Sequence, residues 1–223
     1  MKFDKGLVSL AMTSIALVLT CCQHRVSTIL DDPDCSPPCW NEIVPGFTSP
    51  EEALSYLSSS PEIDQGNKEF EISRGYWSWL FTPGYSESSG RIYFNEFNVY
   101  EIALVFDRPV PINKIIEIYG DPQFVSFISG WADTKWMLFV FLYPDRGIAL
   151  KSFDFWFWPD RDDVRIGQAT KIEEIYFFEP GMLWDENTLS RIFKLNAYES
   201  TVQESLQDWH GYGSYQYTSK ELR

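Results

Sequence analysis

The sequence predicts an α+β fold of two tandem helix-plus-antiparallel-sheet modules with a C-terminal helical segment. A helix start led by proline occurs at Pro50 and again at Pro111, and each is followed at the same spacing by a second proline, Pro61 and Pro122. Aromatic-rich segments with the character of strands follow both helices. The repeat is too long for a solenoid unit, so two stacked modules are expected.

Two helices are expected from their start signals and apolar positions. In "GFTSPEEALSYL", Thr48 or Ser49 can cap the helix, Pro50 suits its first turn, and the two glutamates that follow complement the helix dipole. In "VPINKIIEIYGDP", Pro111 begins the same pattern, and Gly120 is expected to end the helix.

The strands expected after each helix define the modules. "YWSWLF", "VYEIALVF", "KWMLFVFLYP" and "IEEIYFF" are rich in aromatic and β-branched residues, which favour strands. We expect a first α/β module over residues 40–108 and a second over residues 109–180. A C-terminal helix in "ENTLSRIF" and a tail are expected over residues 181–223.

An apolar run near the N-terminus predicts a removable signal peptide over residues 1–21. Lys2 and Lys5 precede the run, which extends from Leu7 to Leu19 with only small interruptions. It is shorter than the roughly 20 residues that a membrane-spanning helix needs, and its layout is typical of a secretory signal. The chain is therefore expected to be exported.

The run ends in Leu19-Thr20-Cys21-Cys22, which resembles the lipobox of bacterial lipoproteins. The resemblance implies cleavage before a cysteine whose sulfur then carries a diacylglycerol, with acyl chains such as palmitate. Cys22 is the preferred lipidation site, because Leu19 then takes the aliphatic position, and Cys21 is the alternative. Such an anchor holds a domain on lipid without a spanning helix. The expected location is the cell membrane or outer membrane, facing outside the cytoplasm.

Composition and charge narrow the choice of partners. Apolar residues make up 44% of the chain and charged residues 22%, which are ordinary globular values, and the formal net charge is −14. This charge argues against nucleic acid and against electrostatic docking on anionic lipid. Residues 22–39 are polar with clustered aspartates and are expected to form a tether. The expected partners are lipid, through the anchor, and an unidentified protein or glycan.

The remaining cysteines, Cys35 and Cys39, predict a disulfide. Outside the cytoplasm a pair this close usually oxidises. A zinc site would need further soft ligands, and His24 and His210 are the two histidines of the sequence. We therefore expect neither a metal site nor a cofactor.

The helix starts also carry a family resemblance. The segment from Gly46 to Leu57 (Gly-x-Thr-x-x-Glu-Glu-Ala-x-x-x-Leu) and the later Gly120-Asp121-Pro122 resemble the module of small outer-membrane-assembly lipoproteins of the SmpA/OmlA type. Tandem copies of that module build the β-lactamase-inhibitor-protein fold. The resemblance implies a helix packed on an antiparallel sheet whose surface or loops bind other proteins, and it assigns no binding residue to this chain.

The segment "KSFDFWFWP" supplies the candidate binding surface. Successive side chains of a strand point to opposite faces. One set is expected to join the core, namely Phe153, Phe155 and Phe157. The other set, Asp154, Trp156 and Trp158, is expected either to lie under a helix or to form an exposed platform for a protein or a wall glycan.

No catalytic residue is predicted. The sequence has neither a G-x-S-x-G motif nor a glycine-rich phosphate loop. We expect a non-catalytic, membrane-anchored lipoprotein that binds a protein or another envelope component. The alternative is a cell-envelope hydrolase that acts on glycan through two carboxylates about 5 to 9 Å apart.

Overall fold

The computed structural model describes residues 35–71, 75–83, 85, 87–131, 135–154, 163–182, 188, 192 and 205–216. The predicted signal peptide, both candidate lipidation sites Cys21 and Cys22, and most of the predicted tether lie outside the described residues. Within the described ranges, no helix is both long and apolar enough to cross a membrane.

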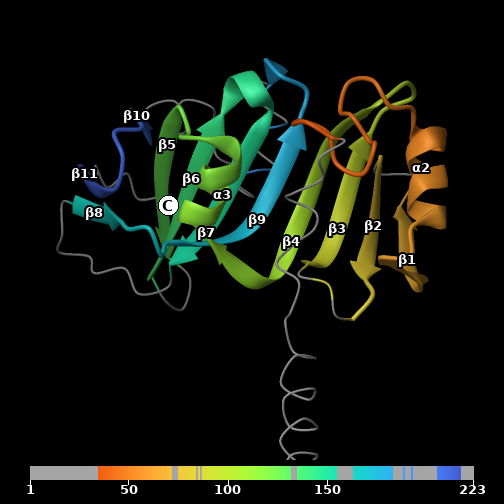
Figure 1. Cartoon of the computed structure of the whole chain (residues 1–223), viewed down its shortest axis with the longest axis horizontal. Helices are drawn as coiled ribbons and strands as arrows, with labels where there is room; N and C mark the ends of the chain where they lie inside the picture. The colour runs from red at the N-terminus through yellow and green to blue at the C-terminus, as the bar shows by residue number, and fades with distance from the viewer. Residues whose placement is uncertain are drawn as a thin grey trace, which may run out of the picture.

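The described chain forms one nine-stranded antiparallel sheet, a separate two-stranded sheet and two α-helices (Figure 1). The large sheet has the order β1-β2-β3-β4-β9-β7-β6-β5-β10. Its strands are β1 (Ile63–Glu71), β2 (Tyr76–Phe81), β3 (Glu87–Phe94), β4 (Val99–Pro111), β5 (Phe124–Trp131), β6 (Lys135–Tyr143), β7 (Ile148–Asp154), β9 (Lys171–Phe178) and β10 (Leu206–Asp208). The small sheet pairs β8 (Asp163–Ile166) with β11 (Gly213–Gln216). The helices are α2 (Pro50–Ser59) and α3 (Ile112–Tyr119).

The prediction of two tandem helix-plus-sheet modules is wrong, because the strands of both halves belong to one continuous sheet. β9 lies between β4 and β7 and pairs antiparallel with both, so that Ile102 and Ile148 are both register partners of Phe177. The prediction of a helical C-terminal segment is also wrong as a whole: Thr188 and Ile192 of "ENTLSRIF" are helical, but residues 206–208 and 213–216 form the strands β10 and β11. Strand propensity locates extended segments but does not identify the neighbour that completes their hydrogen bonds.

The sequence of β9 explains its central position. Ile172, Ile175 and Phe177 belong to the main buried cluster, whereas Tyr176 and Phe178 belong to a second cluster. A strand with one face in water alternates apolar and polar residues, but a strand covered on both faces is apolar almost throughout. The first half of β9 carries Lys171, Glu173 and Glu174, but residues 175–178 (IYFF) are of the second kind and fit between two other strands with both faces covered.

Helix α2 begins where the sequence predicts. The hydroxyl of Ser49 accepts from the Glu52 amide at 3.3 Å, and the Glu52 carboxylate accepts from the Ser49 amide at 3.0 Å, which completes a capping box. Ala53 and Leu57 are buried in the main cluster. The helix is thus fixed by its N-terminal hydrogen bonds and by one apolar stripe.

Helix α3 also has the predicted bounds. It follows Pro111 and ends at Gly120, which has a φ of 71°. Ile112, Ile115 and Tyr119 are its buried residues, and they pack into the main cluster. A positive φ is costly for a residue with a Cβ, so glycine suits this end of the helix.

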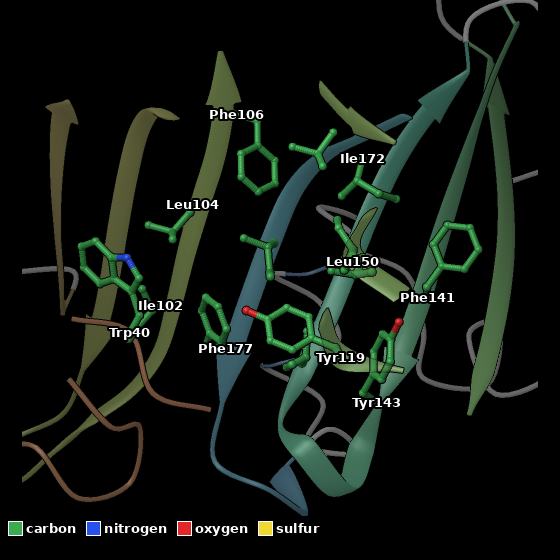
Figure 2. Packing of buried hydrophobic residues seen from close by; sticks show 14 of the residues in the cluster. Trp40, Ile102, Leu104, Phe106, Tyr119, Phe141, Tyr143, Leu150, Ile172 and Phe177 are labelled. Atoms are coloured by element: carbon green, nitrogen blue, oxygen red, sulfur yellow. The ribbon is translucent and has the colours of Figure 1, made fainter. Parts of the chain in front are cut away.

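Both helices cover the same face of the sheet, which we call the helix face. Figure 2 shows Leu104 of β4, Phe177 of β9 and Leu150 of β7 gathered with Tyr119 of α3. Trp40, which precedes α2, joins this core and is 2% exposed. The side of the sheet that carries the alternate residues of the same strands is called the opposite face.

Candidate functional site

A hollow of about 650 Å³ lies on the opposite face, over β1 to β4 and β9. Its lining combines hydroxyl, amide, aromatic and charged side chains with two glycines. The lining residues are Gly66, Asn67, Ser78, Trp79, Leu80, Ser89, Gly90, Arg91, Tyr93, Ala103, Val105, Glu174 and Tyr176. Its volume lies within the range of small-ligand sites.

Strand alternation places the polar side chains there. In β2, Trp77 and Trp79 belong to the main core, so Ser78 and Leu80 face the hollow. In β3, Ile92 is in the core, and its neighbours Arg91 and Tyr93 line the hollow. Successive register pairs align Ser78 with Arg91, Arg91 with Ala103, and Ala103 with Tyr176, so these residues form one row across four strands.

The lack of a side chain at Gly90 leaves room for the aromatic core residues that pack beneath the hollow on the helix face. It is the register partner of Trp79, and a Cβ at this position would overlap the Trp79 ring. That ring stacks on Trp40 with centroids 5.4 Å apart and 15° between the planes. The two stacked indoles lie on the helix face, and from there they support the strands that carry the site.

Arg91 is held within a cluster of tyrosines. Its guanidinium carbon lies 5.2 Å from the ring centroid of Tyr76 and 5.9 Å from that of Tyr93. Nη1 also donates to the Tyr93 hydroxyl at 3.1 Å. The Tyr93 ring lies 5.7 Å from that of Tyr76 and 6.3 Å from that of Tyr100. Cation–π contacts and a hydrogen bond thus orient an exposed arginine.

A buried charged network forms the wall on β9. Glu174 lines the hollow, and its Oε2 lies 3.6 Å from Nζ of Lys151 on β7, which is fully buried. The Tyr176 hydroxyl donates to the same carboxylate oxygen. Burial, followed by the charge of Glu174 and this hydrogen bond, raises the pKa of Tyr176 well above its usual value. Tyr176 therefore stays protonated and remains a donor to Glu174.

The lining offers one carboxylate among the described residues, that of Glu174. This carboxylate already accepts from Tyr176 and pairs with Lys151. Hydrolysis of a glycan by two carboxylates needs a second such group across the site. The described part of the chain also contains no group of three or more side chains arranged to hold a metal ion.

The structure pairs Cys35 with Cys39, whose Cα atoms are 5.2 Å apart. Phe153, expected in the core, is half-buried and packs against the second cluster on the opposite face. Asp154 ends β7, and its side chain is not described; Phe155, Trp156, Phe157 and Trp158 lie outside the described residues. The aromatic platform therefore stays a prediction.

The sequence reasoning missed the residues of the hollow. Two signals in the sequence point toward them. In "YWSWLF" the tryptophans alternate with smaller and more polar residues, which indicates that one face is not core. Lys151 follows the apolar run Ile-Ala-Leu and Glu174 precedes the apolar run Ile-Tyr-Phe-Phe, and a charge beside such a run needs a partner when it is buried.

Comparison with known proteins identifies no match for this chain among family models, curated proteins or solved structures.

Proposed function

We propose that this chain is a lipid-anchored, non-catalytic protein outside the cytoplasm whose hollow binds another component of the cell envelope. The observation that carries the proposal is the exposed Arg91, which is held beside two tyrosines and lines a concave surface. Tyrosine and arginine are enriched where proteins bind partners, because they combine apolar area with hydrogen bonding. The tyrosine–arginine cluster is therefore suited to binding.

The buried network beside Arg91 supports the same proposal. Placing Lys151 and Glu174 in the interior costs desolvation free energy that a well-packed apolar pair would not incur. Strongly perturbed groups beside a hollow are typical of functional sites. Because Glu174 is held by Tyr176 and Lys151, it forms a fixed polar wall for a ligand.

The proposed location rests on the two cysteine pairs. The lipobox resemblance at Cys22 gives an anchor, and the pairing of Cys35 with Cys39 suits an oxidising compartment. The chain from Cys22 to Cys35 spans at most about 45 Å when extended. From Trp40 onward the chain is packed into the domain, so the anchor holds the folded part close to the membrane.

Changing Cys22 to serine is expected to abolish lipidation. The thiol is the atom that accepts the diacylglycerol in the lipobox scheme, and serine at this position offers no sulfur. Mass spectrometry of the mature N-terminus should find acyl chains on Cys22 in the parent protein and none in Cys22→Ser. A parent protein cleaved elsewhere with an unmodified Cys22 would contradict the proposed anchor, and Cys21→Ser is the matched control.

A photo-crosslinker in place of Leu80 is expected to capture the partner in intact cell envelopes. Leu80 lines the hollow and is 47% exposed, and benzophenone groups react with the C–H bonds of any class of molecule. Arg91→Gln should reduce the crosslinked product about tenfold or more, since hydrogen bonds to a charged group contribute roughly 1.5–3 kcal/mol. The product is measured on denaturing gels and by mass spectrometry.

Two controls accompany that experiment. Arg108→Gln removes the same charge from an exposed position of β4 that does not line the hollow, and it should leave the product unchanged. A crosslinker in place of Phe97, which is 75% exposed in the turn before β4, should not give the same product. A product that appears equally from both sites, or that survives Arg91→Gln, would contradict a binding site in the hollow.

A further inference from the structure

We infer that the ligand of the hollow is an oligosaccharide that carries carboxylate groups. The inference rests on the proposed function and adds the chemical class of the ligand. Three features of the hollow carry it: the charge that it presents, the geometry of Arg91, and the kinds of side chain that line it.

The charged side chains around the hollow differ in exposure: the cation Arg91 is exposed, whereas the carboxylates of Glu174 and of Glu101, the register partner of Tyr93, are buried. The formal net charge of the protein is −14, yet Arg91 is the cationic side chain among the described lining residues. The one lining carboxylate, that of Glu174, is offset by Lys151 at 3.6 Å. Arg91 is therefore the charged group that a ligand in the hollow can reach, and it attracts an anionic group.

The side chain of Arg91 is oriented in a way that suits the binding of a carboxylate. The Tyr93 hydroxyl accepts from Nη1, and the rings of Tyr76 and Tyr93 hold the plane of the guanidinium. Nη2 and Nε remain as donors, and two parallel N–H groups match the two oxygens of a carboxylate. Because the side chain is already ordered, binding costs less conformational entropy than for a free arginine.

The other lining groups favour a sugar over a peptide or a flat protein surface. Ser78 and Ser89 provide hydroxyls, and Asn67 provides a carboxamide whose Nδ2 donates to Asp64 at 2.7 Å. These groups can exchange hydrogen bonds with sugar hydroxyls, while Leu80 and the ring of Tyr93 offer apolar surface to the C–H face of a sugar ring. A volume of about 650 Å³ holds a short oligomer and does not require a partner of large area.

The test is a panel of uronic-acid-containing oligosaccharides, each beside its carboxyl-reduced counterpart, measured against the full-length lipidated protein in detergent. Reduction replaces each carboxylate by a CH₂OH group and keeps the rings and linkages. At least one acidic member should bind about 10- to 100-fold more tightly than its reduced form. Arg91→Gln should remove that difference, and Arg91→Lys should restore only part of it, since lysine lacks the fork.

Arg108→Gln is the matched control and should bind like the parent protein. An unchanged melting temperature of Arg91→Gln would show that any loss does not come from unfolding. The inference is overturned if no acidic member outbinds its reduced form, if Arg91→Gln binds as well as the parent, or if poly-glutamate competes equally. If these binding results are not obtained but the Leu80 crosslink still depends on Arg91, the binding site is retained and this class of ligand is rejected. Failure of both would reject the proposed function as well.

Discussion

Replacing Phe177 by alanine is expected to lower the free energy of unfolding by about 3–5 kcal/mol. Phe177 is the last residue but one of β9, is 1% exposed, and packs in the main core, where β9 lies between strands β4 and β7. Truncation removes apolar contacts and leaves a cavity that neighbouring strands cannot close without breaking their register. Urea denaturation followed by circular dichroism measures the change, with a lower midpoint and a similar slope.

Phe97→Ala is the control for that experiment. The same atoms are removed, but the Phe97 side chain is 75% exposed, so its loss should change the free energy of unfolding by no more than about 0.5 kcal/mol. Typical domains have only about 5–15 kcal/mol of stability, so the core variant is expected to be close to unfolding at 37 °C. Equal effects of the two substitutions would show that β9 is not in the centre of the core.

Lys151→Met is expected to destabilise the protein by about 3–5 kcal/mol. The substitution keeps an unbranched side chain one atom shorter than lysine, and it leaves the Glu174 carboxylate, which is 7% exposed, without the ammonium that lies 3.6 Å away. The double variant Lys151→Met, Glu174→Gln should be more stable than Lys151→Met alone, because the buried negative charge is then gone. Urea denaturation of both variants and of Glu174→Gln completes a double-mutant cycle.

An exposed ion pair provides the comparison. Lys114 and Glu117 on α3 lie 2.8 Å apart, but their side chains are 56% and 59% exposed. Solvent screens such a pair, so Lys114→Met should cost no more than about 0.5 kcal/mol although its atoms are closer together. If Glu174→Gln gave no rescue in the Lys151→Met background, the two groups would not be coupled.

The local elements of the fold could be predicted from the sequence, but the pairing of the strands could not. Ser49 and Gly120 mark the helix ends through backbone hydrogen bonding and a positive φ, and both effects act within a few residues. β9 was expected as a strand and is one. Its place between β4 and β7 depends on partners distant in the chain, and strand propensity contains no such information.

The site was missed for the same reason. The sequence alone does not mark Arg91 as a site residue. Only the strand register places it beside Tyr76 on one neighbouring strand and opposite Ala103 on the other. Lys151 and Glu174 each border an apolar run in the sequence, but only the pairing of β7 with β9 brings them together. The sequence shows both charged residues, but that they form an ion pair could be recognised only from the order of the strands in the sheet.

The position of β9 in the sheet also determines when the edge of β4 is covered during synthesis of the chain. β1 to β4 pair in chain order, so they can assemble as soon as residue 111 has emerged. The second edge of β4 then carries Ile102 and Leu104 without a neighbour until residues 171–178 arrive. An exposed apolar edge invites pairing with other chains. A chain cut off after β7 is therefore expected to aggregate through the uncovered edge of β4.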